Sequence, residues 1–194
     1  MHSAISNFIA LAEREAAAHA DSADRVLAIA PAMRRLAREG IGVLTQDQIR
    51  SDPAHYNRNA IHICPQGDIS LFALVWLPGQ WTPVHDHGSW GVVGVLQGHL
   101  QERAYMPRDG EIKTNDGIVL RRGGVVLLDP GSVSTFVPNP DHIHMTGVPE
   151  DGEVCVSLHL YGRNMDSFHI YDVVAGTRKL IDVPHQKVGT DIDA

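Results

Sequence analysis

The pattern of hydrophobic and polar positions changes once along the chain. Between residues 3 and 39 the sequence is rich in Ala, Leu, Glu and Arg, and apolar residues recur at helical spacing: Phe8, Leu11 and Ala12, then Val26, Ile29, Met33 and Leu36. Such stripes predict amphipathic helices with one buried face. Gly40 follows as a helix C-terminal cap. We therefore expect two or three helices within residues 1–45.

From about Asn59 onward the pattern consists of short apolar runs separated by Gly, Pro, Asp and Asn. The runs are NAIHIC, ISLFALVWL, WGVVGVLQG, HLQERAYM, EIKTN, GIVLR, VVLLD, VSTFV, HIHMTGV, VCVSLHLY and FHIYDVV. Short strands at this spacing are typical of a mainly β sandwich or closed barrel. No linker-like stretch divides the chain. The sequence predicts a single domain over residues 1–194, with a helical part (1–45) packed on a β-barrel (56–183).

Composition and charge exclude several classes of partner. The 194-residue chain has a formal net charge of -7, which gives no basic surface for nucleic acid or for an anionic membrane. No apolar stretch approaches the roughly 18 residues of a membrane span, and the first residues lack the features of a signal peptide. Two cysteines are too few for a disulfide framework. We expect a cytoplasmic protein whose partner is a small molecule, with no protein partner implied.

Twelve histidines make a search for metal-ligand spacing worthwhile. In the segment PVHDHGSWG, His85 and His87 are two residues apart, so a strand turns both to one face and Asp86 to the other. This spacing suits two ligands of one metal ion, but it also suits a surface or hydrogen-bonded pair. A third ligand could be His142 or His144 in DHIHMTG, and alternation does not choose between them.

A second group of polar residues lies in VCVSLHLY. Ser157, His159 and Tyr161 alternate with aliphatic residues, so a strand places all three on one face. In a barrel with an interior metal ion this would be the reactive face, although a half-exposed edge strand gives the same pattern. A hydrolase triad is not indicated, because no nucleophile elbow is present and the Ser and His lie on one strand.

The spacing of glycines and histidines resembles the first motif of the cupin superfamily, G-x5-H-x-H-x3-E-x6-G. The matching residues are Gly79, His85, His87 and Gly98, while Gly91 stands where the motif has a glutamate. The segment GGVVLLDPGS resembles the start of the second cupin motif more loosely. This resemblance implies a double-stranded β-barrel with its metal ion inside.

Residues 56–172 also resemble the cysteine dioxygenase family of thiol dioxygenases, through YNRN, HDH and VCVSLHLYGRNMDSFHIYD. The resemblance implies three histidine ligands on Fe(II), which here are His85, His87 and His144, with His142 as the alternative to His144. It also implies that Ser157, His159 and Tyr161 form a hydrogen-bonded relay that places the phenol hydroxyl near substrate and oxygen.

The missing glutamate has a chemical meaning of its own. Neutral imidazoles leave the full +2 charge on the metal site, which favours an anionic soft donor such as a thiolate. Three histidines would also bind Zn²⁺, so the ligand set alone does not choose the metal. Iron follows only from the family resemblance.

The family resemblance gives two answers on the substrate. Arg58 matches the arginine with which cysteine-oxidising members bind the substrate carboxylate, a task suited to a planar guanidinium, and Arg163 is a second candidate contact. By spacing alone, Arg58 could equally be a surface residue. Members that prefer 3-mercaptopropionate share a run like HDHGSWG, but they carry glutamine at the position of Arg58 and arginine where this chain has Ile170.

The sequence therefore predicts a non-haem Fe(II) thiol dioxygenase that converts a small carboxylate-bearing thiol and O2 to a sulfinic acid. L-cysteine is the preferred substrate, with 3-mercaptopropionate or mercaptosuccinate as alternatives. Other classes are a non-catalytic metal-binding cupin that acts as a sensor or scaffold, and a zinc or manganese cupin isomerase or hydrolase. The relay residues favour an enzyme. No cysteine lies between Gly88 and Gly98, so we expect no thioether on Tyr161.

Overall fold

The computed structural model describes the chain except residues 109, 111, 139–141, 184–185 and 188–194. Two helices open it, α1 (Ser3–Ala18) and α2 (Ser22–Arg38), followed by short 3-10 turns at Gly40–Val43 and Gln46–Ile49. The Asp21 carboxylate accepts hydrogen bonds from the first backbone N–H groups of α2. Gly40, with φ of 70°, follows the end of α2, as the sequence predicts.

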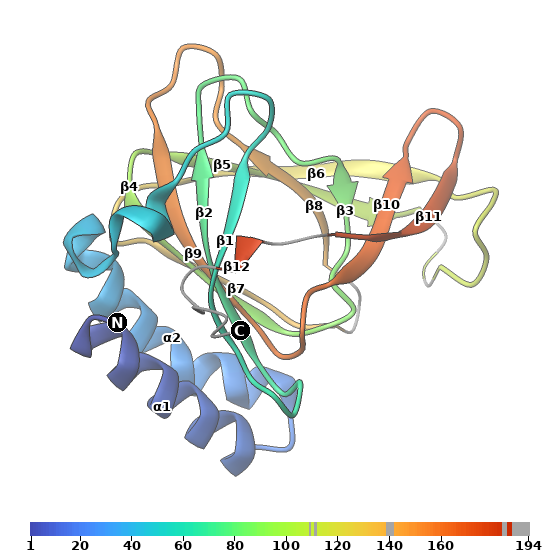
Figure 1. Ribbon diagram of the computed structural model, residues 1–194. Coiled ribbons are helices and arrows are strands. Elements are labelled where there is room, and N and C mark those ends of the chain that lie inside the picture. Colours follow the sequence, from blue (N-terminus) through green and yellow to red (C-terminus); the bar gives the residue numbers. More distant parts are fainter. Residues whose placement is uncertain (109, 111, 139–141, 184–185, 188–194) are drawn as a thin grey trace, which may run out of the picture.

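The rest of the described chain forms two six-stranded sheets (Figure 1). The first sheet has the order β12-β1-β2-β9-β4-β7, and the second has the order β11-β10-β3-β8-β5-β6. The strands are β1 (Asn57–Ile63), β2 (Ser70–Trp76), β3 (Val84–His85), β4 (Gly91–Gln97), β5 (Leu100–Pro107), β6 (Leu120–Leu128), β7 (Val133–Phe136), β8 (Ile143–Gly147), β9 (Cys155–Tyr161), β10 (Ser167–Asp172), β11 (Thr177–Asp182) and β12 (Gln186–Lys187). This confirms the expected mainly β, double-stranded barrel with N-terminal helices.

The helices cover only the first sheet (Figure 1). Ile29 and Met33 of α2 belong to the same apolar cluster as Val92 of β4 and Leu158 of β9. Strands β2 and β9 are buried along their whole length because they are covered on both faces. The outer strands of the second sheet are open to solvent: Val125 of β6 is 62% exposed. Among the described residues, no helix is both long and apolar enough to cross a membrane.

The observed strands differ from the sequence-based expectation at several places. The runs GIVLR and VVLLD belong to one strand, β6, which continues through Gly123 and Gly124. In EIKTN, residue 111 lies outside the described part, and residues 112–115 form no strand. Strand β11 was missed, because Thr177–Asp182 contains few apolar residues and none of its residues is fully buried.

Candidate active site

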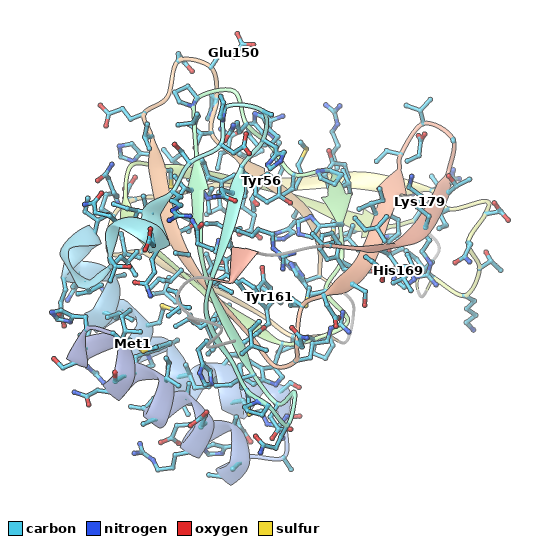
Figure 2. All side chains as sticks on the ribbon, viewed as in Figure 1. Met1, Tyr56, Glu150, Tyr161, His169 and Lys179 are labelled. Atoms are coloured by element: carbon cyan, nitrogen blue, oxygen red, sulfur yellow. The ribbon has the colours of Figure 1, made fainter. Side chains whose placement is uncertain are left out.

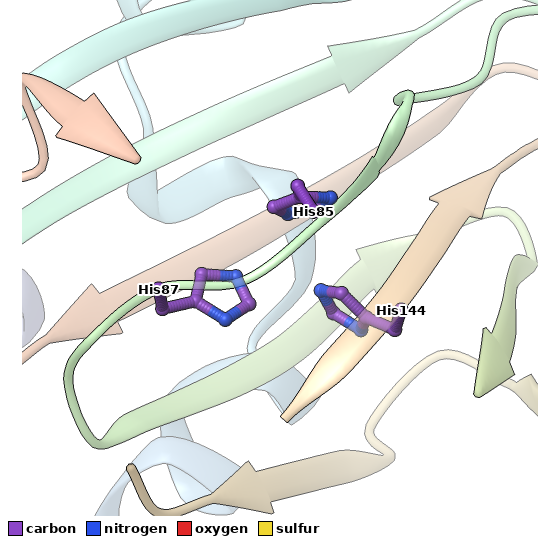
Figure 3. Close-up of side chains that lie close together, drawn as sticks. All are labelled: His85, His87 and His144. Atoms are coloured by element: carbon purple, nitrogen blue, oxygen red, sulfur yellow. The ribbon is translucent and has the colours of Figure 1, made fainter. Parts of the chain in front are cut away.

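Three histidines converge between the two sheets (Figure 3). His85 ends β3, His87 follows two residues later, and His144 lies on β8 directly opposite His85. One ligand atom from each residue lies within 4.8 Å of the others, and all three side chains are buried. The structure thus brings together the three residues that the family resemblance selected, in a group that could hold one metal ion.

The protonation of these rings suits metal binding. Burial, followed by the neighbouring histidines, lowers the pKa of His85 and His87 well below the ordinary value, so both rings are neutral. His85 Nδ1 lies 3.0 Å from the Pro83 carbonyl oxygen, to which it donates, so its Nε2 keeps a lone pair. His87 Nδ1 is buried without a hydrogen-bond partner among the described residues. A neutral, partly unsatisfied donor set of this kind fits a transition-metal ion.

Glu102, a residue that sequence reasoning missed, binds the third histidine from behind. Its carboxylate on β5 accepts hydrogen bonds from His144 Nδ1 at 3.1 Å and His142 Nε2 at 2.7 Å, and Ser134 Oγ donates to its other oxygen at 3.3 Å. Burial would raise the pKa of Glu102, but the bonds from the two histidines hold it well below its usual range. His142 thus faces Glu102, and a second group that could bind a metal is Glu102, His142 and His144.

The position of the absent cupin glutamate is filled by an aromatic ring. A Cβ atom on Gly91 would lie 2.2 Å from Cζ of Phe136, so no side chain fits there without displacing the ring. Phe136 stacks on His87, with ring centroids 4.3 Å apart. The structure therefore gives a steric reason why the first sheet offers no carboxylate to the three histidines.

Asp86 points away from its two histidine neighbours, as strand alternation predicts. Its carboxylate accepts hydrogen bonds from the Tyr171 hydroxyl at 2.7 Å and from the backbone N–H of His169 at 3.1 Å. Both partners lie on β10, so Asp86 fastens the short β3 segment to the neighbouring strand. The His169 ring contributes here as well, with Nδ1 3.2 Å from the Asp86 carboxylate.

Ser157, His159 and Tyr161 form a hydrogen-bonded chain on β9 that Trp76 extends. The Trp76 Nε1–H can only donate, and it donates to Ser157 Oγ at 2.9 Å. Ser157 Oγ also lies 2.9 Å from His159 Nε2, and His159 Nδ1 lies 3.3 Å from the Tyr161 oxygen. Burial lowers the pKa of His159 to about 3, so the ring is neutral and carries one proton. In the tautomer with that proton on Nδ1, Ser157 donates to Nε2, His159 donates to the Tyr161 oxygen, and the phenol proton is left for another acceptor.

That hydroxyl lies beside a small cavity that also contains the three histidines. Burial raises the pKa of Tyr161, which keeps the phenol protonated. The cavity volume is about 20 Å³, enough for an ion or about one water molecule. Its lining is Tyr56, Arg58, Leu74, Thr82, His85, His87, His144, Thr146, His159, Tyr161, Met165 and Phe168. Tyr56, which directly precedes β1, and Tyr161 of β9 are labelled in Figure 2.

The two arginines expected to bind an anion are placed differently. Arg58 lines the cavity and is only 8% exposed, with Nη2 donating to the Met165 carbonyl at 2.7 Å and Nη1 buried without a partner among the described residues. Arg163 does not line the cavity. Its guanidinium donates to the backbone oxygen of Ser167. Arg58 is therefore the arginine placed to meet a ligand beside the histidines.

The cysteines lie apart from the relay tyrosine. Gly91 is the residue paired with Tyr161 on β4, and Cys64 and Cys155 are both free. Cys155 is buried in the core and does not line the cavity, and burial raises the pKa of its thiol to about 12. The absence of a thioether on Tyr161 stays a prediction, for which intact-mass measurement is the test.

Together, the barrel and its interior three-histidine group define a metal-binding protein of the cupin type. The family model for cysteine dioxygenase type I matches residues 23–174. The chain belongs to the cysteine dioxygenase type I family.

Individual relatives are more distant. The chain is 28% identical to cysteine dioxygenase type 1 of Bos taurus over 140 residues and 27% identical to that of Homo sapiens over 143 residues. Each match covers 71% of this chain and 66% of the relative, so the chain spans slightly less than two thirds of their length.

Among solved structures, the chain is similar to a protein with a double-stranded β-helix domain from Klebsiella pneumoniae (16% identity, 68% of this chain and 97% of that one, TM-score 0.47). It is also similar to hydroquinone 1,2-dioxygenase PnpCD (14% identity, 57% and 66%, TM-score 0.43). These structures are too distant to bear on the activity.

Proposed function

We propose that the protein is a non-haem Fe(II) thiol dioxygenase that oxidises a small carboxylate-bearing thiol, with L-cysteine as the first candidate. His85, His87 and His144 would hold the iron, which when bound supplies the redox chemistry between thiol and O2. In the overall reaction, R–SH and O2 give R–SO2H: both oxygen atoms enter the product, and sulfur loses the four electrons that O2 gains.

The observation that carries this proposal is the unpaired guanidinium of Arg58 in the same cavity as the histidines. A buried cation is costly unless a charged partner meets it, and Arg58 has no ion pair among the described residues. Its free Nη1 suits a substrate carboxylate. The Arg58 guanidinium also lies 4.8 Å from the Phe72 ring centroid, which fixes its plane.

Tyr161 would supply the other polar contact to the reacting groups. In the tautomer of His159 with its proton on Nδ1, the ring donates to the Tyr161 oxygen, and the phenol proton is available to a substrate or oxygen atom in the cavity. The free volume of about 20 Å³ is smaller than any such thiol, so lining side chains must move when the substrate enters. In this proposal Arg58 orients the substrate, Tyr161 donates a proton to the reacting groups, and the cavity walls exclude water from the reaction.

The cavity leaves the role of the substrate amine open to experiment. Its lining contains no Asp or Glu to pair with an ammonium group. 3-Mercaptopropionate lacks only the amino group of cysteine, so comparing the two thiols measures what the amine contributes. The HDHGSWG run, shared with mercaptopropionate-preferring members, makes that thiol the second candidate, followed by mercaptosuccinate.

Oxygen-electrode turnover of the Fe(II)-loaded protein tests the proposal. We expect uptake of one O2 per thiol with cysteine, 3-mercaptopropionate or mercaptosuccinate, and mass spectrometry with ¹⁸O2 should find two labelled oxygen atoms in the product. Cysteamine, which lacks the carboxylate, should be a poor substrate. The dioxygenase proposal fails if no thiol supports oxygen uptake, and a non-catalytic metal-binding cupin then becomes the better description.

A further inference from the structure

Glu102 lies behind His144, outside the cavity lining, in a position that neither the sequence motifs nor the proposed function uses. It lies on β5, which pairs with β8 so that Ala104 is opposite His144 and Glu102 is opposite Thr146. Glu102 and His144 therefore project from the same face of the second sheet. Glu102 is 7% exposed and has no lysine or arginine partner among the described residues, so its hydrogen bonds must come from its histidine and serine neighbours.

The hydrogen-bond geometry assigns the protons on both histidines. A carboxylate can only accept, so His142 Nε2 and His144 Nδ1 each carry a hydrogen directed at Glu102 Oε1. The 3.2 Å contact between these two nitrogens is then a contact between donors that share one acceptor. With its Nδ1 protonated, neutral His144 has its lone pair on Nε2, the nitrogen that remains for the metal.

The same geometry gives different positions to His142 and His144, between which strand alternation did not choose. His144 is buried and lies 4.7 Å from His85 and 4.9 Å from His87 between ring centroids. His142 has a 26% exposed side chain, and its Nε2 is directed at the carboxylate. His142 thus completes the hydrogen bonding of Glu102 while His144 faces the other two ligands.

We propose that Glu102 is a positioning residue that fixes the metal-binding tautomer of His144 and supplies, one hydrogen bond away, the negative charge that other cupins place on the metal itself. This inference rests on the proposed role of His144 as a metal ligand. A carboxylate behind a ligating imidazole orients the ring and makes it a better donor. The ligand sphere stays free of carboxylate, which preserves its preference for an anionic thiolate.

Metal binding in the absence of any thiol tests this role. Glu102→Gln keeps the size of the side chain and removes its charge, and we expect Co(II) affinity to fall by about 10- to 100-fold, measured by competition with a chromophoric chelator. Glu13→Gln is the matched control, because Glu13 accepts from His62 Nε2 at 3.1 Å in a surface pair. That control should bind Co(II) as the wild type does. Equal affinity of Glu102→Gln and wild type would overturn the proposal.

A second measurement separates positioning from general damage. In the Zn(II)-loaded protein, ¹⁵N-edited NMR should show a His144 Nδ1 proton far downfield in the wild type and shifted upfield in Glu102→Gln. An unchanged shift contradicts the proposal. If Glu102→Gln does not fold, Glu102→Asp keeps the charge but reaches less far, and it should weaken Co(II) binding by a smaller factor. If Glu102→Gln is unfolded and Glu102→Asp binds Co(II) as tightly as the wild type, the positioning role of Glu102 is contradicted.

His142→Asn tests whether His142, and not His144, is the third metal ligand. We expect a smaller loss of Co(II) affinity than in Glu102→Gln, because His142 acts on the metal only through the carboxylate. A larger loss would make His142 the ligand and overturn the assignment. None of these measurements uses thiol turnover, so a wild-type protein that binds metal but oxidises no thiol would refute the proposed function and leave the role of Glu102 standing.

Discussion

The two sheets contribute different chemistry to one cavity. The second sheet and the loop after β3 supply His85, His87 and His144, whereas the first sheet supplies Arg58 from β1 and the relay residues from β9. The first sheet is sealed on its outer face by α1 and α2, while the second sheet exposes its outer strands to solvent. The three histidines and the residues proposed to contact the substrate therefore lie in separate sheets that both line the cavity.

Because the two groups lie in different sheets, mutations should affect metal binding and thiol turnover separately. Changes in the second sheet should remove the metal, and with it every activity. Changes in the first sheet should leave metal binding intact and affect only what happens to the substrate.

Replacing His85 with Ala should have the largest effect, because it removes one of three proposed ligands. We expect metal affinity to fall by more than about 100-fold, beyond the usual loss of an outer-sphere partner, with no detectable oxygen uptake. Metal content after gel filtration, measured by plasma mass spectrometry, gives the readout, and circular dichroism verifies the fold. A His85→Ala protein that retains stoichiometric metal would mean that the metal site is elsewhere.

Tyr161→Phe should slow turnover strongly and leave metal binding unchanged. The change removes only the phenol hydroxyl, which ends the series of hydrogen bonds that begins at Trp76. Loss of a positioned proton donor lowers the turnover rate by about 100-fold or more. Oxygen-electrode rates and Co(II) affinity should be measured on the same preparation. Equal turnover in the two proteins would remove the relay from the mechanism, and a matching loss of metal would contradict the separation of the two sheets.

The sequence predicted the layers of this fold better than the contacts between them. Runs of apolar residues indicated most strands, because burial of β2 and β9 on both faces leaves a continuous hydrophobic signal. The polar edge strand β11 left no such signal. Alternation also placed His85 and His87 on one face, and the relay residues of β9 on another.

Contacts between distant strands could not be predicted in the same way. His142 and His144 share parity, and only the pairing of β3 with β8 puts His144 opposite His85. Glu102 is 42 residues from His144 and follows no motif, so nothing local indicates its role. The sequence offered Arg163 as an anion contact as well as Arg58. Its guanidinium instead donates to the backbone oxygen of Ser167, four residues later. The family resemblance selected the three histidines that the structure brings together, and it gave no indication of Glu102 beside His144.

Arg58→Gln should have a smaller effect than loss of the relay, and it should depend on the substrate. A hydrogen bond between charged groups contributes about 1.5–3 kcal/mol, so kcat/KM for carboxylate-bearing thiols should fall roughly 10- to 150-fold. The much lower rate with cysteamine should not change. Arg163→Gln is the matched control, because Arg163 lies outside the cavity lining. A similar loss in both variants, or an equal loss with cysteamine, would remove Arg58 from the carboxylate role.

Gly91→Ala should have the smallest effect, and it tests a contact between the first sheet and His87, one of the three histidines. The added Cβ would meet three atoms of the Phe136 ring at 2.2–2.8 Å, and this ring stacks on both His87 and His142. Overpacking of this kind lowers the free energy of unfolding by about 1–3 kcal/mol, which urea denaturation can measure.

A double-mutant cycle shows whether that cost comes from the ring. In a Phe136→Ala background, Gly91→Ala should cost close to nothing, because the ring that excludes the new side chain is gone. The same cost in both backgrounds would mean that Phe136 is not what excludes a side chain at Gly91. Because the Phe136 ring stacks on His87, Gly91→Ala should also weaken metal binding slightly. At Gly91 and Phe136, a change in the first sheet would then affect the metal group of the second.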